Sequence, residues 1–317
     1  MMTKSLYSTN SIKIIDLFAG IGGIRLGFQN ATNRNIECVF SSEWNKYSVQ
    51  TYQENYGAEV VHGDITQVDE KDVPEHDILL AGFPCQPFSQ AGLKKGFEDT
   101  RGTLFFDIAR ILKEKKPKAF LLENVKQLKG HDKGKTLEVI LNTLHDIGYK
   151  NTQYTLLKAR DFGLPQNRER LYIVGFLDES IAFNFPTPTH KETRVGDILE
   201  AYVEDKYTIS DKLWAGHQRR KENNKKNGKG FGYRLFNEDS EYTSTISARY
   251  YKDGSEILIE QQGKNPRKLT PKEAAKLQGF PVDFKIPVSD TQAYQQFGNS
   301  VPVTVIEAIA KEMLKHI

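Results

Sequence analysis

The sequence has 317 residues, of which 27% are charged, and its formal net charge is only +3. This length allows one large domain or two smaller ones. The only cysteines, Cys38 and Cys85, argue against a disulfide-stabilised secreted fold and for a reducing compartment. The first residues lack the apolar core of a signal peptide, and no apolar run reaches the ~20 residues that span a bilayer. We therefore expect a cytoplasmic protein without a membrane segment.

The first half of the chain alternates short apolar runs with helical patterns. Runs typical of buried strands occur at 12–18, 37–44, 59–65, 77–83, 118–124 and 170–177. Helical patterns lie between them at 24–31, 102–116 and 137–148. In the second of these, Leu104, Ile108 and Ile111 share one face of the helix. This alternation predicts an α/β fold with a doubly wound, mostly parallel sheet.

The composition changes near residue 185. FPTPTH (185–190) is a proline-rich break, and the sequence after it is polar and punctuated by glycine. The chain ends with an apolar helical pattern at 301–314, which needs a sheet to pack against. We predict a first domain at 1–185, a second, smaller domain at 186–290, and a C-terminal segment, 291–317, that returns to the first domain.

Positive charge is concentrated in the second domain. Between Asp211 and Arg234, eight Lys or Arg oppose Asp211 and Glu222, which gives a local net charge of +6. A polyanion is the natural partner for such a segment. A solvated loop is an equally good interpretation of a charge run taken alone.

A glycine-rich turn, DLFAGIGG (16–23), follows the first predicted strand and opens a helix. Such a turn lets a ligand approach backbone amides. The nicotinamide fingerprint G-x-G-x-x-G requires a third glycine, but Arg25 stands there. The next two strands end in acids, Glu43 and Asp64, which suit ribose hydroxyls and an adenine amino group, although both could instead cap the following helices.

An adenosine-containing ligand without a pyrophosphate fits this pattern best. S-adenosyl-L-methionine is such a ligand: its carboxylate can lie against the first helix N-terminus. A flat apolar side chain such as Phe18 or Trp44 can cover its adenine. The sequence therefore favours S-adenosyl-L-methionine over a dinucleotide.

Cys85 lies between two prolines in GFPCQPFS (82–89), so it belongs to a stiff loop rather than to a strand or helix. It follows the fourth strand, and Glu123 closes the fifth, so both should reach the carboxyl edge of the sheet. Arg168 and Arg170 lead into the next strand and could lower the pKa of the thiol or hold an anion.

Two other chemistries fit less well. None of the histidines lies at a strand end with a suitable partner, which argues against a protease, and a lone cysteine lacks the paired spacing of a zinc site. Cys38, within ECVF, is typical of a buried strand.

At this point the motifs identify a resemblance. The chain resembles the bacterial DNA (cytosine-5)-methyltransferases of restriction–modification systems. The similarity extends almost from end to end and rests on nine motifs in the order and spacing of that family: DLFAGIGG, SSEW, GDI, GFPCQPFS, RGTLFFDIARI, ENV, QNRER, RKLTPKEAAKLQGFP and QFGNSVP. It is weakest between about 186 and 267, where members of the family diverge because this part selects the DNA sequence.

The resemblance implies a covalent mechanism. The thiolate of Cys85 is expected to add to C6 of a cytosine flipped out of duplex DNA, while Glu123 bonds N3 and the amino group. C5 then receives the methyl group of S-adenosyl-L-methionine, leaving S-adenosyl-L-homocysteine. Arg170 is expected to hold the base oxygen, and Arg168 the nearby backbone or Glu123. The first domain becomes the catalytic and cofactor-binding domain, and the second the target-recognition domain.

The resemblance also implies sets of binding residues. The expected cofactor residues are Phe18, Gly20, Gly22, Gly23, Glu43, Trp44, Asp64, Ile65, Gly82, Pro84 and Asn299. The loop that follows Cys85 is expected to close over the flipped base and to offer phosphates Lys94, Lys95 and Arg101. No metal is expected.

The second domain is expected to recognise DNA. SARYYKDGSEILIE (247–260) is typical of a hairpin that turns at Asp253–Gly254. Its side chains before the turn, and an arginine upstream, are expected to contact DNA: Arg234, Arg249, Tyr250, Tyr251 and Lys252. The segment resembles that of enzymes that modify sites with paired cytosines and guanines, including the CCWGG type. A hairpin built for folding alone would look similar.

Three alternatives remain open. A related branch methylates transfer RNA with the same catalytic residues, but its Cys-Phe-Thr stretch is absent here. A DNA-binding protein without chemistry would not need the four predicted catalytic residues, and a nicotinamide oxidoreductase would not need Cys85. We expect a monomer in the cytoplasm, held at the nucleoid by DNA. A cognate restriction endonuclease would act separately.

Overall fold

The computed structural model describes residues 11–84, 104–230 and 232–317. Its main sheet has the strand order β3-β2-β1-β4-β5-β7-β6. The strands are β1 (Ile12–Leu17), β2 (Ile36–Ser42), β3 (Val61–His62), β4 (Ile78–Gly82), β5 (Ala119–Val125), β6 (Asn151–Lys158) and β7 (Glu169–Phe176). The first five are parallel, whereas β7 runs antiparallel to both β5 and β6. The predicted doubly wound, mostly parallel α/β fold is confirmed.

Helices cover both faces of this sheet. They are α1 (Gly23–Asn30), α2 (Lys46–Tyr56), α3 (Leu104–Lys115), α4 (Lys135–Asp146) and, from the end of the chain, α8 (Val303–Met313). Along β5, Phe120 and Leu122 face the cluster formed with α3 and α4, whereas Leu121 faces the cluster formed with α1 and α8. The alternation of buried side chains on a strand thus builds two apolar layers from one run.

The strand β6 was not predicted. Its sequence, NTQYTLLK, is polar at its start, and most of its residues are only partly buried because it lies at the edge of the sheet. An edge strand needs few apolar residues, so its periodicity signal is weak.

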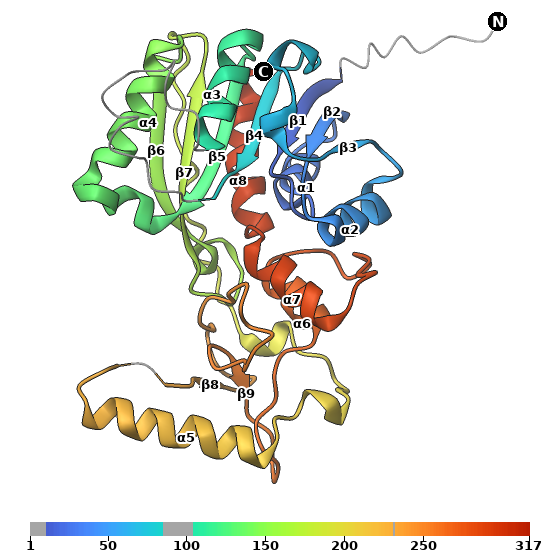
Figure 1. Cartoon of the computed structure of the whole chain (residues 1–317), viewed down its shortest axis with the longest axis vertical. Helices are drawn as coiled ribbons and strands as arrows, with labels where there is room; N and C mark the ends of the chain where they lie inside the picture. Colours follow the sequence, from blue (N-terminus) through green and yellow to red (C-terminus); the bar gives the residue numbers. More distant parts are fainter. Residues whose placement is uncertain (1–10, 85–103, 231) are drawn as a thin grey trace, which may run out of the picture.

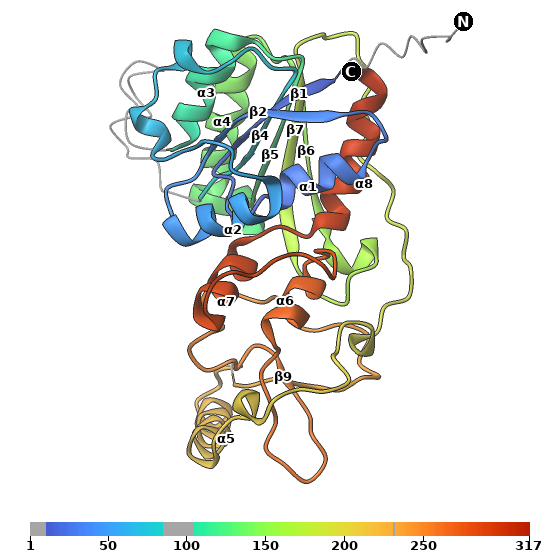
Figure 2. The same cartoon turned by 90° about the vertical axis from the view of Figure 1, so that its right-hand side faces the viewer.

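A smaller lobe lies beyond the carboxyl edge of the sheet (Figures 1 and 2). It contains α5 (Asp211–Lys226), β8 (Leu235–Phe236) and β9 (Leu258–Ile259), with α6 (Pro271–Leu277) and α7 (Asp290–Asn299) on the side of the sheet. Its own apolar cluster includes Tyr250, Leu269, Leu277 and Phe297. The domain limits 1–185, 186–290 and 291–317 stay a prediction.

The expected hairpin at 247–260 does not form. Residues 247–254 make successive turns, in which the amides of Tyr250 and Gly254 donate to the carbonyls of Ser247 and Tyr250. The strand that follows, β9, pairs in parallel with β8. The reason is that Tyr250 is completely buried and anchors the segment to the apolar cluster instead of leaving it free to form a ribbon.

The last helix returns to the sheet because α1 offers it a flat surface. A Cβ atom added to Gly27 would lie 2.5 Å from Cγ2 of Ile306 and 3.0 Å from the backbone nitrogen of Glu307. Only a glycine allows the two helices to approach this closely. Ile306, Ile309 and Met313 then complete the apolar layer that covers the sheet.

We expect Gly27→Ala to destabilise the protein by about 1–3 kcal/mol, because the added methyl group overpacks the contact between α1 and α8. The matched control is Gly216→Ala in α5, where nothing lies within 4 Å of the added atom. There the better helix propensity of alanine should stabilise by about 0.5–1 kcal/mol. Urea unfolding of both variants measures the difference, and equal effects would contradict the packing argument.

Candidate active site

A cavity of about 880 Å³ opens at the carboxyl edge of the sheet and brings together residues from both lobes. Of the predicted cofactor residues, ten line it: Phe18, Gly20, Gly23, Glu43, Trp44, Asp64, Ile65, Gly82, Pro84 and Asn299. The same wall contains Glu123, Arg168 and Arg170, together with Arg249 and Tyr251 from the smaller lobe. Cys85, Lys94, Lys95 and Arg101 lie outside the described residues.

The glycine turn is held open by Glu43. The amide of Gly20 donates to Oε2 of Glu43, and the amide of Asn45 donates to Oε1, both at 2.8 Å. Burial raises the pKa of Glu43, and the backbone N–H groups that bond it lower the pKa by less. One carboxylate therefore fixes the turn and faces the cavity at the same time.

Gly22 serves the turn without lining the cavity. Its φ of 79° is left-handed, and a Cβ atom there would lie 2.2 Å from the ring of Tyr56. The hydroxyl of Tyr56 donates to the carbonyl of Gly22 at 2.8 Å. The role of Gly22 that the structure supports is thus the shape of the turn.

Asp64 and Trp44 lie on the outer wall of the cavity. Oδ1 of Asp64 accepts from the amide of Thr66 at 3.0 Å, so this acid caps the short helical turn that follows it. Trp44 is 84% exposed although it lines the cavity, which leaves its indole free to cover a flat ligand. The capping interpretation is therefore correct for Asp64, and it leaves the second carboxylate oxygen for a ligand.

The segment around Asn299 forms part of the cavity wall. A Cβ atom added to Gly23 would lie 2.9 Å from Oγ of Ser300 and 3.0 Å from Cγ2 of Val301. The glycine turn and the end of α7 thus pack in direct contact. This contact explains how Asn299, far away in the sequence, reaches the cofactor side of the cavity.

Glu123 and Arg170 form the charged centre of the cavity. Oε1 of Glu123 lies 3.2 Å from Nε of Arg170, and both side chains are largely buried. Burial raises the pKa of Glu123, and the neighbouring Arg170 and Arg168 offset only part of this effect. More of the carboxyl group is therefore protonated near neutral pH than in an exposed glutamate.

Arg168 is a structural tie rather than an open binding group. Its guanidinium donates to the carbonyl of Ile246 at 3.2 Å, to that of Gly298 at 3.1 Å, and to that of Ser300. It is 1% exposed, and burial lowers its pKa. This agrees with the expected role of Arg168 toward the backbone, whereas the partner of Glu123 is Arg170.

Some residues of the site were not predicted. Asn124 donates from Nδ2 to the carbonyl of Phe83 at 2.9 Å and so ties the end of β5 to the segment that leads to Cys85. In the sequence, the position of Asn124 next to Glu123 in the motif ENV could have indicated a role at the site. Gln292 and Gln295 of α7 also line the cavity. No periodicity marks them, because they reach the site only through the fold.

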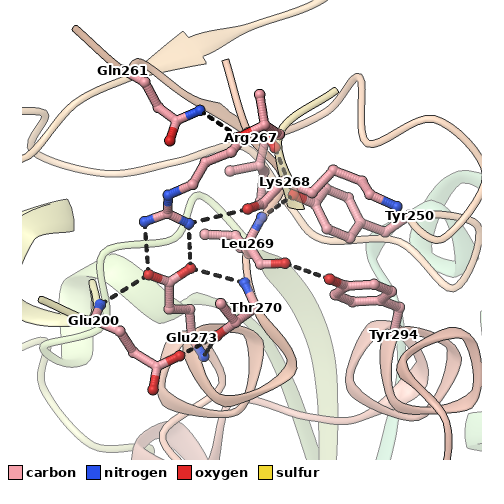
Figure 3. Close-up of polar contacts among 11 residues, drawn as sticks. Glu200, Tyr250, Gln261, Arg267, Lys268, Leu269, Thr270, Glu273 and Tyr294 are labelled. Atoms are coloured by element: carbon pink, nitrogen blue, oxygen red, sulfur yellow. Dashed lines mark hydrogen bonds and ion pairs between the residues drawn. The ribbon is translucent and has the colours of Figure 1, made fainter. Parts of the chain in front are cut away.

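Tyr250 was predicted to contact DNA, and the structure contradicts this. Its hydroxyl donates to the carbonyl of Ile257 at 2.6 Å. The same hydroxyl accepts from the amide of Leu269 at 2.8 Å (Figure 3). With 0% exposure, its side chain cannot reach a groove. Arg249, before it, is exposed at the cavity, and Tyr251, after it, also lines the wall. The tyrosine thus supports its neighbours from inside.

The comparisons with known proteins agree with this geometry. A family model described as C-5 cytosine-specific DNA methylase matches residues 12–315. The chain belongs to this family. The type II methyltransferase M.NlaX of Neisseria lactamica is 72% identical to this methylase over 302 residues, which cover 95% of this chain and 96% of the relative. M1.ScrFI of Lactococcus lactis subsp. cremoris is 68% identical, with 97% and 79% covered.

Solved structures support the fold of this methylase. The crystal structure of the S. pombe Dnmt2 methyltransferase superposes with a TM-score of 0.80 at 21% identity, covering 96% of this chain and 98% of that one. In the described part of the methylase no helix is long and apolar enough to cross a membrane. The same residues contain no cluster of three His, Cys, Asp or Glu that could hold a metal ion.

Behind the glycine turn, the methylase has a charged cluster around the buried Arg25. Arg25, the residue that breaks the dinucleotide fingerprint, bonds both carboxylate oxygens of Glu59 at 2.7 and 3.0 Å and the hydroxyl of Tyr52 at 3.1 Å. Its guanidinium also lies 4.4 Å from the ring centre of Tyr56. Arg25 is thus used for packing α1 against α2 and does not line the cavity.

Asp16 lies on the same face of β1 as this cluster. It is 1% exposed, and neither of its carboxylate oxygens has a hydrogen-bond partner among the described residues. Burial raises its pKa to about 8, while Arg25 lowers it and Glu43 raises it further. The folded protein therefore holds a proton on Asp16 near neutral pH.

This proton makes stability depend on pH. The unfolded chain releases it above about pH 4, so the free energy of unfolding should fall as the pH rises from about 4 to about 8 and level off above that value. We expect Asp16→Asn to remove this fall and to gain stability relative to wild type by up to about 1.4 kcal/mol per pH unit. Denaturant unfolding across this interval measures it.

The control is Asp77→Asn. Burial would raise the pKa of Asp77, but its bonds with Lys118 and the amide of Lys13 outweigh this and lower it. Ionised Asp77 therefore adds to the free energy of unfolding at neutral pH, and this stabilisation is lost on acidification. The Asp77→Asn variant should thus be less stable than wild type at neutral pH. If Asp16→Asn keeps the pH dependence of wild type, Asp16 is not the protonated group.

Proposed function

We propose that the chain transfers a methyl group from S-adenosyl-L-methionine to C5 of a flipped-out cytosine in a short duplex DNA sequence. The reaction proceeds through a covalent bond between Cys85 and C6, and it protects host DNA from a restriction endonuclease. The observation that carries the proposal is one shared cavity, lined by Glu123 and Arg170 together with the glycine turn and the strand-end acids. An acid for the base and a site for adenosine thus share one space.

The cavity suits S-adenosyl-L-methionine, which supplies the methyl group. Glu43 keeps lone pairs for ribose hydroxyls, and Asp64 keeps an oxygen for the adenine amino group. Exposed Trp44 offers a face for the adenine ring. The amides of Gly20 and Gly22 are bonded within the turn, but no described side chain caps the start of α1, so a carboxylate can bind the first amides of this helix. The product would be S-adenosyl-L-homocysteine.

Glu123 and Arg170 would orient and activate the base. A protonated carboxyl donates to N3 of cytosine, and its other oxygen accepts from the amino group. Protonation at N3 draws electrons from the ring and makes C6 open to attack by the thiolate. Arg170, which holds the carboxylate at 3.2 Å, is placed to donate to the base oxygen as well.

Cys85 would be the nucleophile. Pro84, its neighbour in the chain, lines the cavity, as do Gly82 and Phe83 before it. Bond formation between the sulfur and C6 makes C5 enamine-like, so C5 can take the methyl group. Loss of the C5 proton and of the thiolate then restores the aromatic ring. The covalent intermediate divides one difficult step into two easier ones. A stacked base is not accessible from both faces, so the cytosine has to leave the helix.

Contacts with DNA would come from both sides of the cavity. Arg249 and Tyr251 line it from the smaller lobe, and Lys252 and Arg234 are exposed nearby in the chain. Arginine and lysine can bond guanine edges or phosphates. From the sequence, Lys94, Lys95 and Arg101 add contacts on the other side. The relatives named type II methyltransferases support a role in restriction and modification. Action as a cytoplasmic monomer stays part of the proposal.

The covalent step can be trapped. Bisulfite sequencing of DNA from cells that express the gene first maps the methylated site. A duplex with 5-fluorocytosine at that position should then form a stable adduct with the protein, because fluorine cannot leave C5 as the proton does. Denaturing gels detect the adduct. It should be absent with Cys85→Ser and present with Cys38→Ser, since Cys38 is partly buried in β2 and this burial raises its pKa to about 11.

An adduct on another residue, or none, contradicts the covalent mechanism. Preferential transfer of labelled methyl groups to transfer RNA would support the RNA-modifying alternative. DNA binding without any transfer would support a binding module.

We expect Glu123→Gln to bind DNA normally but to reduce kcat by about 10²–10⁴-fold, because an amide can hold N3 and the amino group but cannot give up a proton. The matched control is Glu169→Gln. This acid pairs with Lys126 at 3.3 Å and does not line the cavity, so its loss should leave kcat almost unchanged. Single-turnover transfer of labelled methyl groups measures both. A variant at Glu123 with normal kcat would contradict the role.

A further inference from the structure

The basic segment of the smaller lobe forms a regular helix, α5. Ser210 caps its start by accepting from the amide of Leu213 at 3.3 Å. Asp211 lies in the first turn, whereas Lys225 and Lys226 lie in the last turn, as the helix dipole favours. Figures 1 and 2 show α5 along the outer edge of the smaller lobe, remote from the sheet. The predicted basic segment is therefore ordered from 211 to 226.

One face of α5 is anchored to the lobe. Trp214 contacts Tyr233 edge to face, with ring centres 4.7 Å apart, and Nζ of Lys221 lies 4.3 Å from the centre of the same ring. His217 is 1% exposed, and its Nε2 lies 3.1 Å from the carbonyl of Asp253. These contacts fix how the helix is rotated about its axis.

An ion pair links α5 to the wall of the cavity. Arg220 donates to Oδ2 of Asp253 at 3.0 Å and lies next to Nδ1 of His217. Asp253 belongs to the same series of turns as Arg249 and Tyr251, which line the cavity. The position of α5 is thus tied to the segment that faces the substrate.

The opposite face of α5 carries cations that make none of these contacts with the lobe. Lys212, Arg219 and Lys226 follow one another at intervals of seven residues, so they form one stripe with steps of roughly 10 Å. All three are exposed, and within the described part of the chain none of them forms an ion pair. The stripe points away from Trp214 and His217, so packing does not explain it.

We propose that this stripe binds the phosphate backbone of the duplex beside the methylated site, without reading its sequence. The proposal rests on the proposed function for the identity of the polyanion. Duplex DNA carries one negative charge per about 1.7 Å of axis, so a row of cations needs no particular register to meet phosphates. Each phosphate neutralised releases counterions, which makes the affinity depend on salt. The contact would hold DNA while the cavity selects a base.

The test compares two double variants of the full chain. Arg219→Gln/Lys226→Gln removes two charges of the stripe, and Lys13→Gln/Lys71→Gln removes two exposed charges in the sheet lobe outside the cavity wall. Fluorescence anisotropy measures binding to a labelled duplex without a target site over a range of salt concentrations. We expect the slope of log K against log[salt] to be shallower by about 1.8 for the first variant and unchanged for the control.

The two failures are distinguishable. The proposal is overturned if both variants have the same slope as wild type, or if the slope of the control variant falls as much as that of the first variant. Neither result depends on methyl transfer. Charge reversal, Arg219→Glu/Lys226→Glu, should weaken binding further. The charge-conserving variant Arg219→Lys/Lys226→Arg should bind DNA like wild type. Thermal melting verifies that each variant folds. With the mapped target, the first variant should raise KM for DNA at unchanged kcat, since α5 does not line the cavity.

Discussion

The structure depends on one buried cation, the guanidinium of Arg168. A buried guanidinium needs acceptors for its donors, and here three carbonyls from two distant segments accept from its terminal nitrogens, whereas Nε has no partner among the described residues. Ile246 belongs to the smaller lobe, while Gly298 and Ser300 flank Asn299 at the end of α7. Because the guanidinium is planar and rigid, these segments have to meet the sheet in one arrangement. The shared cavity is a consequence of that arrangement.

The acids of the cofactor side have two tasks. Glu43 holds the glycine turn, and Asp64 caps the next turn, yet both face the cavity. Capping and ligand binding are often regarded as alternatives for such residues. Here they are compatible, because a carboxylate has about four acceptor positions and a backbone amide uses only one of them. The capping bonds also hold each carboxylate in place before a ligand arrives.

The smaller lobe is organised around a second buried charge. Glu273 is 0% exposed and accepts from both terminal nitrogens of Arg267, at 2.7 and 2.8 Å, and from the amide of Thr270 (Figure 3). Between these residues, Leu269 bonds the hydroxyls of Tyr250 and Tyr294. These buried bonds thus fix the turns at 247–254, which place Arg249 at the cavity and Asp253 next to α5. Losing one partner would leave an unpaired charge in an apolar core.

Local patterns in the sequence predict six of the seven strands of the main sheet, the acids at their carboxyl ends and the glycine turn, because burial on both faces and tight turns leave such patterns. The sequence also determined the family, through motifs such as GFPCQPFS and QNRER. Three features follow only from long-range packing: the turns at 247–254 in place of a hairpin, the inward position of Tyr250, and the places of β6 and Gln292. Local propensity does not distinguish a segment that forms an exposed hairpin from one that makes turns and packs into a core. Contacts such as that between Leu269 and Tyr250, which join residues far apart in the chain, decide between them.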